Sequence, residues 1–237
     1  MKKRDAAKTK RNILTAAEAV FSEKGFHGSR IDEIARLAEA NKKLIYDHFD
    51  SKQELYRAVF VYVYSRLAAE EKAVLRSTAG EVSAVSKIVN IISLYFDYLQ
   101  TNPNYINLLM QENLQKGVNI GSFDMSEPRA EAIGLLKEVL ACGITEGVFR
   151  KEANIEQSII ALLMFTFSYY SNRYTLSKML QCDMFDPQFL EEERKYFTEF
   201  FLRYLCVPEV LAHMDMESLL CGRRQTAVSE PTEAIQA

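Results

Sequence analysis

A short segment in the first quarter of the chain gathers side chains that suit contact with phosphates or base edges. Lys42, Lys43, Tyr46, His48 and Lys52 place three cations and two further hydrogen-bonding rings within eleven residues. Lysine can bind guanine edges or phosphates, and Tyr and His can donate hydrogen bonds to phosphate oxygens. A basic, solvated surface helix would show the same pattern, so spacing alone leaves both interpretations open.

The elements that must position these side chains are indicated by helical periodicity and caps. Apolar residues recur at helical spacing over residues 8–24, and Gly25 follows as a C-cap. Ser29 then begins a second helix and, with Asp32 three residues later, is close to a capping box. Two short helices therefore precede the basic segment.

The basic segment lies on a third helix that is short and well capped. Asn41 is a good N-cap for a helix over residues 42–47. Ser51 with Glu54 forms a capping box that begins a long helix over residues 52–77. A turn of three or four residues joins the second and third helices, which is the geometry of a helix-turn-helix. Any small three-helix bundle is the alternative.

Helix N-termini add two further candidate anion sites. Lys52 stands at the start of the fourth helix, and Ser29 and Arg30 stand at the start of the second. A recognition helix presents its N-terminal residues to the major groove. The candidate DNA-binding residues are therefore Ser29, Arg30, Lys42, Lys43, Leu44, Tyr46, His48 and Lys52.

Charge is divided unevenly along the chain. Residues 1–52 carry a net charge of +4 and the remainder −7, and residues 1–11 alone hold six cations against Asp5. A basic head on an acidic body favours nucleic acid at the head. A solvated basic tail would give the same asymmetry.

Composition predicts an all-α fold. The 237 residues are 48% hydrophobic and 26% charged, with 9 Gly and 5 Pro, which disfavours disorder and the turn-rich β-sandwiches. Further helices are expected over residues 81–100, 103–115, 127–146, 155–180 and 187–205, with N-caps at Asn102, Asn154 and Asp186. Residues 1–52 form the predicted head, 53–78 a connecting helix, 79–207 the body, and 208–237 a tail that is mobile after any helix around 209–220.

No motif indicates an enzyme, a metal or a cofactor. The chain lacks G-x-S-x-G, a P-loop, G-x-G-x-x-G and H-E-x-x-H, and its three histidines are scattered. The four cysteines form no C-x-x-C pair and are expected to be free thiols in a reducing compartment. The N-terminus shows no signal peptide, and the longest uncharged run, residues 157–172, is too short to span a membrane and is interpreted as a buried helix. We therefore expect a cytoplasmic protein.

The head resembles the N-terminal domain of the TetR family of bacterial transcription regulators over residues 8–60. The resemblance rests on Ile13-Leu14, Ala17, Phe21, Lys24-Gly25-Phe26, Ser29, Ile34-Ala35, Ile45-Tyr46, His48-Phe49, Ser51-Lys52 and Glu54-Leu55. Two positions depart from the family. Glu39 stands where a turn glycine is usual, and Lys43 stands where a small residue is usual.

The resemblance implies a homodimer that binds a palindromic operator and is released from it by a small-molecule effector. The family pairs through its last two long helices, here residues 155–180 and 187–205. Candidate dimer residues are Phe197, Phe200, Phe201 and Tyr204, although burial within one subunit is the alternative. The better candidates for ligand contact are Tyr95, Gln111, Tyr169 and Arg173. A helical ligand-binding adaptor and a non-specific DNA-binding protein are the competing interpretations.

Overall fold

The computed structural model describes residues 2–77 and 82–215, and within these ranges the chain is helical. Its elements are α1 (Lys2–Gly28), α2 (Ile31–Leu37), α3 (Lys42–Phe49), α4 (Lys52–Ser77), α5 (Ala84–Thr101), α6 (Pro103–Leu114), the 3-10 helix η1 (Glu127–Arg129), α7 (Ala130–Thr145), α8 (Ile155–Leu180), α9 (Pro187–Leu205) and α10 (Pro208–Ala212). The predicted all-α class is confirmed. The described residues form no strand, only an isolated bridge between Phe149 and Cys206.

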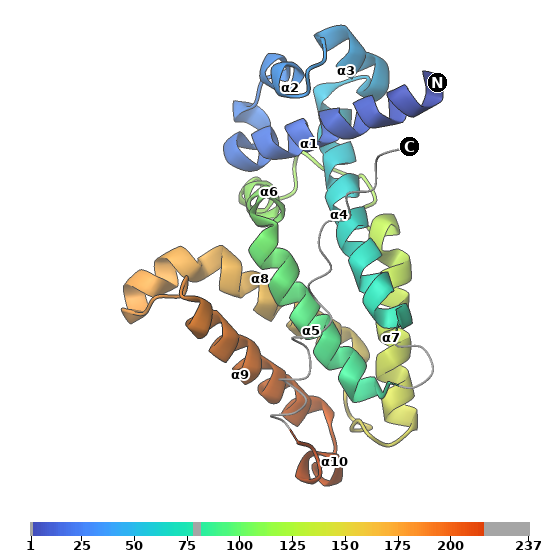
Figure 1. The fold of residues 1–237 in the computed structure, drawn as a ribbon, viewed down its shortest axis with the longest axis vertical. Helices are drawn as coiled ribbons and strands as arrows, with labels where there is room; N and C mark the ends of the chain where they lie inside the picture. Colours follow the sequence, from blue (N-terminus) through green and yellow to red (C-terminus); the bar gives the residue numbers. More distant parts are fainter. Residues whose placement is uncertain (1, 78–81, 216–237) are drawn as a thin grey trace, which may run out of the picture.

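The head consists of α1 to α3 packed on the first turns of α4, at the top of Figure 1. Its core is built from the apolar faces that the periodicity predicts, with Ile13, Ile34, Ile45 and Leu55 almost fully buried. Gly25 breaks α1 at a φ of +66°, a conformation that glycine adopts without steric cost.

The break turns Phe26 back onto the head. Its ring meets that of Tyr56 on α4 at 5.1 Å, so the end of α1 is fixed against the helix that leads to the body.

Two of the helix caps expected in the head are present, and the third prediction, of a cap at Ser29, is wrong. Asn41 accepts from the Leu44 amide at 2.8 Å, and Ser51 accepts from the Glu54 amide at 3.1 Å. Ser29 does not cap α2, because the backbone stays helical to Gly28 and the buried Ser29 hydroxyl donates to the Phe26 carbonyl at 2.8 Å. Arg30 occupies the cap position without a side-chain hydrogen bond.

The turn between α2 and α3 is made without glycine. Glu39 adopts a φ of +51°, and the Ala40 amide donates to the Ala35 carbonyl at 2.9 Å. A non-glycine residue in this region carries a steric cost of about 1–2 kcal/mol.

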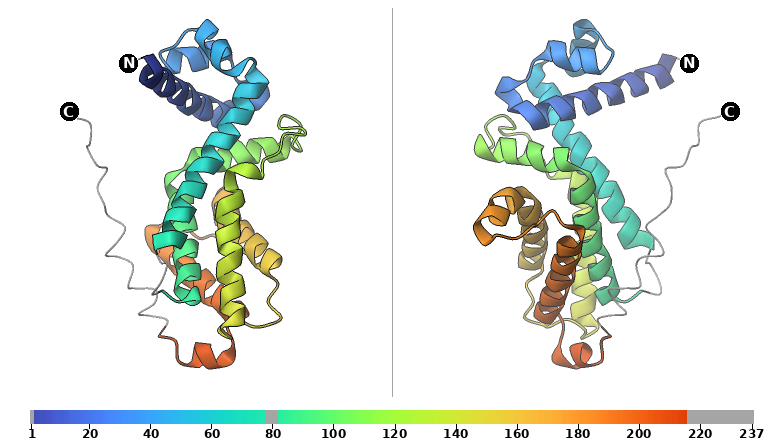
Figure 2. Two further views of the ribbon diagram at one scale, coloured as in Figure 1. Left: turned by 90° about the vertical axis from the view of Figure 1, so that its right-hand side faces the viewer. Right: turned by 60° about the vertical axis from the view of Figure 1, so that its left-hand side comes forward.

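The body is arranged around α5. Helices α4 and α7 lie on one side of α5 and α9 lies on the other, as Figures 1 and 2 show. Helix α6 lies directly beneath α1, so the body meets the head through α6 as well as through α4. The C-terminal helices match the predicted ranges closely, except that η1 precedes α7.

The predicted tail begins with a short helix, α10, which spans residues 208–212 rather than 209–220. Residues 216–237, with Cys221, lie outside the described residues. Of the other C-terminal caps, Asn154 and Asp186 accept from the amides of Gln157 and Gln188, both at 2.9 Å. Asn102 occupies the N-cap position of α6 and Pro103 follows it as expected, but its side chain makes no cap hydrogen bond, because the side-chain amide donates to the Tyr98 carbonyl at 2.9 Å.

The uncharged run 157–172 forms part of α8 and is buried on one face only. Leu162, Thr166 and Tyr170 are buried, whereas Ile160 and Met164 are exposed. No helix in the described part of the chain is long and apolar enough to cross a membrane.

Candidate functional site

The outer face of α3 carries most of the predicted DNA-binding residues. Ile45 and Phe49 are buried and hold the helix against the head. The side chains on the opposite face point to solvent, with Lys42, Lys43 and Tyr46 exposed and Leu44 and His48 half-buried. The helix therefore has the division into a packing face and a free face that a recognition helix requires.

An acidic partner for Lys42 was not anticipated from the sequence. Asp32 on α2 lies 2.8 Å from the Lys42 ammonium, and this hydrogen bond raises the pKa of Lys42. Both side chains are largely exposed, so the pair is open to water and to competing anions. A phosphate near Lys42 would compete with Asp32.

The N-terminus of α2 presents Arg30 but not the Ser29 side chain. Arg30 is exposed, whereas Ser29 is 4% exposed and its hydroxyl is engaged by the Phe26 carbonyl. The expectation that the Ser29 hydroxyl contacts DNA therefore does not fit this geometry.

Lys52 has an internal role that the sequence did not suggest. Its ammonium group donates to the Ser29 carbonyl at 2.7 Å and lies 4.7 Å from the centre of the Phe26 ring. Partial burial lowers the pKa of Lys52. The residue thus joins the start of α4 to the α1–α2 connection, and an ammonium group has two further donors for an outside anion.

The basic start of α1 lies beside α3. Lys8, Lys10 and Arg11 are exposed, and the Lys10 ammonium is 5.6 Å from the centre of the Phe49 ring. The cations of the N-terminal segment and of α3 therefore belong to one end of the molecule, which accounts for the uneven charge along the sequence.

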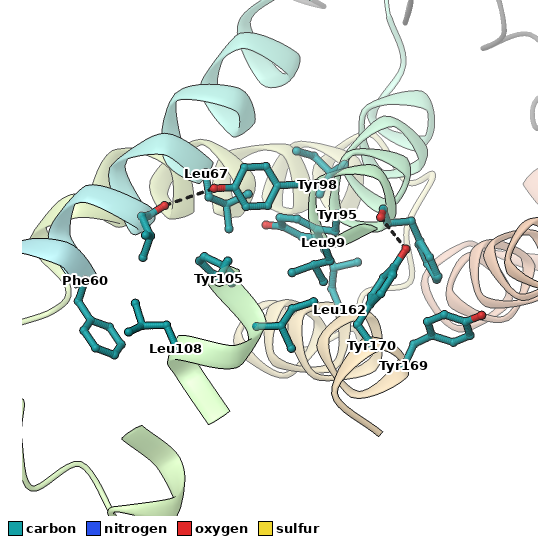
Figure 3. Packing of buried hydrophobic residues seen from close by; sticks show 14 of the residues in the cluster. Phe60, Leu67, Tyr95, Tyr98, Leu99, Tyr105, Leu108, Leu162, Tyr169 and Tyr170 are labelled. Carbon is teal, nitrogen blue, oxygen red and sulfur yellow. Dashed lines mark hydrogen bonds between the residues drawn. The ribbon is translucent and has the colours of Figure 1, made fainter. Parts of the chain in front are cut away.

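The body contains a cavity of about 270 Å³ between α4, α5, α6, α8 and η1, partly open to solvent beside the exposed Met164. Figure 3 shows Tyr95, Tyr98, Leu99 and Tyr105 around this region. Its lining is mainly aromatic and aliphatic and comprises Tyr64, Leu67, Tyr95, Tyr98, Leu99, Tyr105, Leu109, Asn113, Arg129, Leu163, Met164, Thr166 and Phe167. A mostly apolar cavity with a few polar groups is typical of a small-molecule site.

A buried ion pair stands in the wall of this cavity. The Arg129 guanidinium donates to both carboxylate oxygens of Glu71, through Nη2 and, at 3.3 Å, through Nε. The Tyr95 hydroxyl donates to the same carboxylate. Burial and the neighbouring Glu71 raise the pKa of Tyr95 well above its usual value. Neither Arg129 nor Glu71 was singled out from the sequence.

Of the four predicted ligand residues, only Tyr95 lines the cavity. Gln111 lies between α6 and α1, where its Oε1 would stand 2.9 Å from a methyl group placed on Gly25. The Tyr169 hydroxyl donates to the Met184 carbonyl at 2.7 Å. Arg173 packs on the Phe185 ring, 4.6 Å from its centre. The Tyr169 hydroxyl has a hydrogen-bond partner, whereas Nε of Arg173 is buried without one. None of these three side chains lines the cavity.

The predicted dimer residues divide into two pairs. Phe197 and Phe201 are buried within the subunit, and the Phe197 ring stacks on Phe165 at 3.8 Å. The expectation that these two form a dimer contact is therefore wrong. Phe200 and Tyr204 are 56% and 47% exposed and remain available on α9.

Head and body are joined at a buried carboxylate on α6. Glu112 is 4% exposed and accepts from the Tyr56 hydroxyl on α4 at 3.0 Å. It also accepts from the backbone amides of Asn119 and Ile120, at 2.9 and 3.0 Å. The helix that lines the cavity through Tyr105 is thus bonded to the helix that carries the head.

A basic helix-turn-helix head, carried by a long helix on a helical body with a cavity, is the architecture of a DNA-binding regulator. Comparison with known proteins makes the assignment specific. Residues 13–59 match the family model described as "Bacterial regulatory proteins, tetR family", and residues 85–200 match "Tetracyclin repressor-like, C-terminal domain". The chain belongs to the TetR family and is a DNA-binding transcriptional regulator.

Two curated relatives are informative. The HTH-type transcriptional repressor NicS of Pseudomonas putida is 32% identical over 201 residues, which cover 84% of this chain and 93% of NicS. The HTH-type transcriptional repressor SCO4008 of Streptomyces coelicolor is 34% identical over 117 residues, which cover 49% of this chain and 56% of that protein.

Solved structures share the fold at lower identity. A putative TetR-family regulator from Shewanella sp. PV-4 has a TM-score of 0.59 at 19% identity and covers 84% of this chain and 98% of its own. The regulator FadR from Bacillus subtilis, solved in complex with stearoyl-CoA, has a TM-score of 0.56 at 17% identity and covers 82% of this chain and 98% of its own.

Proposed function

We propose that the protein is a homodimeric repressor that binds a palindromic operator and releases it when a small molecule occupies the body cavity. The observation that carries this proposal is the pairing, in one chain, of a free basic face on α3 with a mainly apolar cavity in the body, whose helix α6 packs on α1 of the head. The repressor names of the two curated relatives support the direction of regulation.

DNA contact is assigned to the free face of α3 and its surroundings. Lys42 and Lys43 stand at the N-terminal end of α3, which enters the major groove first in this motif. Leu44, Tyr46 and His48 complete the face, and Arg30 and the remaining donors of Lys52 are placed for phosphates. A dimer would set two such helices in major grooves about one helical turn apart or somewhat more.

The dimer contact is assigned to apolar side chains that α8 and α9 leave exposed. Tyr196, Phe200 and Tyr204 recur every four residues along α9, and α8 exposes Ile160 and Met164. A helix with an apolar stripe outside its own core indicates a second partner, and C2 dimers are the commonest oligomers. Phe200→Glu should therefore shift the protein toward monomer in analytical ultracentrifugation.

The control for this substitution is Leu114→Glu, because Leu114 is 73% exposed on α6, away from both helices. Leu114→Glu should leave the assembly unchanged. A monomeric parent protein, or equal assembly of both variants and the parent, would contradict the assignment.

The effector would act through α6, which lines the cavity with Tyr105 and Leu109 and contacts the head through Gln111 and Glu112. A ligand must bind one state better than the other to shift the equilibrium. A change from 1:99 to 99:1 requires a difference of about 5.5 kcal/mol.

Selection from a random DNA duplex pool tests the proposed DNA-binding activity. The selected duplex and a scrambled control are then bound at two salt concentrations. An inverted repeat bound about a thousandfold more tightly than the control would support an operator-specific dimer. Equal binding of both would indicate a non-specific DNA-binding protein. No binding at low salt, with or without candidate effectors, would favour the helical adaptor.

A further inference from the structure

We propose that the body cavity binds a small aromatic carboxylate, with the carboxylate on Arg129 and the ring among the surrounding tyrosines. This inference rests on the proposed ligand-regulated function and names the class of its effector. The charge, the hydrogen-bonding groups and the shape of the cavity wall favour this class of ligand.

Arg129 is the cation that the cavity wall offers. Every other residue of the lining is uncharged. The hydrogen bonds of Arg129 to Glu71 use Nε and Nη2, one edge of the planar guanidinium. Nη2 also donates to the Tyr95 hydroxyl at 3.4 Å. Within the described part of the chain, Nη1 makes no hydrogen bond, so this arm of the planar guanidinium fork keeps its donors for a carboxylate. The Arg129 side chain is 13% exposed, so a bond formed there would be shielded from water.

The wall retains hydrogen-bond donors. The Glu71 carboxylate is already occupied by Arg129 and by the Tyr95 hydroxyl. In the described part of the chain, no hydrogen bond joins the hydroxyls of Tyr64 and Tyr105 to another protein group, and both residues line the cavity. Each of these hydroxyls can donate to an acceptor oxygen of a ligand.

The net charge near Arg129 decides between an anion and a neutral acceptor. Glu71 neutralises Arg129 formally, and its carboxylate is bonded by Nε and Nη2 of Arg129 and by the Tyr95 hydroxyl. The Tyr64 and Tyr105 hydroxyls and Nη1 of Arg129 remain for the ligand, and hydrogen bonds to an ionised acceptor are about twice as strong as those between neutral groups. A carboxylate therefore gains more from this wall than an amide of the same shape.

The remaining wall suits a ring. Tyr105 packs edge-on against Tyr64 and Tyr98, with ring centres 5.9 and 5.7 Å apart, and Leu67 and Leu99 add flat apolar surface. Aromatic rings prefer such offset and edge-to-face neighbours. The volume of about 270 Å³ is large enough for one or two fused rings.

Calorimetric titration of the full-length protein without DNA tests the proposal. The probes are benzoate, 2-naphthoate, benzamide and octanoate. At least one aromatic carboxylate should bind, and benzoate should bind about tenfold or more tightly than benzamide, which corresponds to about 1.4 kcal/mol. Equal or tighter binding of benzamide, tighter binding of octanoate than of both aromatic acids, or no binding of either aromatic acid at millimolar concentration would overturn the proposal.

Variants locate the binding site without relying on one substitution. Arg129→Lys keeps a cation beside Glu71 but loses the fork, and should reduce the preference for benzoate over benzamide. Tyr64→Phe and Tyr105→Phe should each weaken the binding of benzoate severalfold. Tyr174→Phe is the matched control, because Tyr174 is 66% exposed on α8 and does not line the cavity. Benzoate binding that is unchanged in both Tyr64→Phe and Tyr105→Phe would place the ligand elsewhere and overturn the assignment.

Failure of this proposal and failure of the proposed function are distinguishable. Operator selection reports on DNA binding without any of these probes. A selected operator together with no aromatic acid binding would overturn the effector class and leave the repressor function standing.

Discussion

The hydroxyl of Tyr56 donates to the carboxylate of Glu112 at 3.0 Å, and this buried contact ties the helix that carries the head to the helix that lines the cavity. The same carboxylate is bonded by the Asn119 side chain at 2.9 Å and by two backbone amides of the loop that follows α6. No lysine or arginine takes part in these hydrogen bonds. The carboxylate is therefore stabilised by neutral donors alone, so the loss of any one donor should lower the stability of the fold.

Removing the Tyr56 hydroxyl should measurably destabilise the protein. Tyr56→Phe deprives a buried carboxylate of one donor, and hydrogen bonds to charged groups contribute about 1.5–3 kcal/mol. Urea unfolding should show a loss of that order. Tyr62→Phe on the same helix is the control, since the Tyr62 hydroxyl lies 3.5 Å from the Thr15 hydroxyl in an exposed contact. A loss no larger than that of Tyr62→Phe would mean that Glu112 does not depend on Tyr56.

Stability should fall in alkaline solution because the body buries several tyrosines. Burial raises the pKa of Tyr56, Tyr105 and Tyr170, and raises that of Tyr169 to about 12. The folded protein therefore keeps these protons to a higher pH than the unfolded chain, whose tyrosines titrate near pH 10. Their contribution is fully present below about pH 10 and is lost as the pH rises further.

The measurement is urea unfolding between about pH 8 and about pH 11, with tyrosinate absorbance recorded in parallel. A group of tyrosines should ionise only as the protein unfolds. Complete ionisation of all tyrosines near pH 10 in the folded state would contradict this expectation.

The free energy of unfolding should rise when glycine replaces Glu39 in the turn between α2 and α3. The left-handed φ of Glu39 costs about 1–2 kcal/mol, against about 0.4–1 kcal/mol for the greater freedom of glycine in the unfolded chain. Glu39→Gly should therefore be more stable than Glu39→Ala by about 0.5–1 kcal/mol. Both variants remove the same charge, so thermal unfolding of the pair isolates the backbone effect. Equal midpoints would indicate that the turn relaxes without cost.

Asp32 should restrain DNA binding through its pair with Lys42. Asp32→Asn removes the competing carboxylate, 2.8 Å from the ammonium, and a negative charge next to the proposed phosphate path. Binding to duplex DNA at low salt should become severalfold tighter and depend more steeply on salt. Glu33→Gln is the control, because Glu33 instead pairs with Lys24 on α1 at 2.5 Å. An equal effect of the two variants would indicate a general charge effect rather than release of Lys42.

Features fixed by neighbours along the chain were predicted well from the sequence. The caps at Asn41, Ser51 and Asp186 are local contacts between residues two or three positions apart, so their motifs locate helix starts directly. The cap assigned to Ser29 was wrong because a second helical segment follows the Gly25 kink and continues to Gly28, so the N-cap of α2 lies one residue later, at Arg30.

Contacts between residues far apart in sequence were not predictable. Glu71 lies 58 positions before Arg129, and Tyr56 lies 56 positions before Glu112. Nothing in the local pattern of either carboxylate names its partner, because packing of α4 against η1 and α6 brings them together. For the same reason Phe197 and Phe200 could not be assigned to the core or to the surface from one amphipathic helix.

Two glycines of α7 should respond in opposite directions to the same substitution. A methyl group on Gly143 would stand 2.9 Å from Cγ of Phe149 and closer still to two other ring atoms, whereas one on Gly134 meets nothing within 4 Å. The Phe149 ring is 1% exposed, and its backbone is fixed by a hydrogen bond from its amide to the Gly143 carbonyl at 2.9 Å. The ring therefore has little room to move away.

Gly143→Ala should accordingly destabilise the body by about 1–3 kcal/mol through overpacking. Gly134→Ala should stabilise it by about 0.5–1 kcal/mol, because alanine loses less backbone entropy than glycine on forming a helix. Urea unfolding of both variants and the parent measures the difference. If Gly143→Ala were as stable as Gly134→Ala, then α7 would not approach Phe149 as closely as described, and the contact that places the end of α7 beside the bridge to Cys206 would have to be revised.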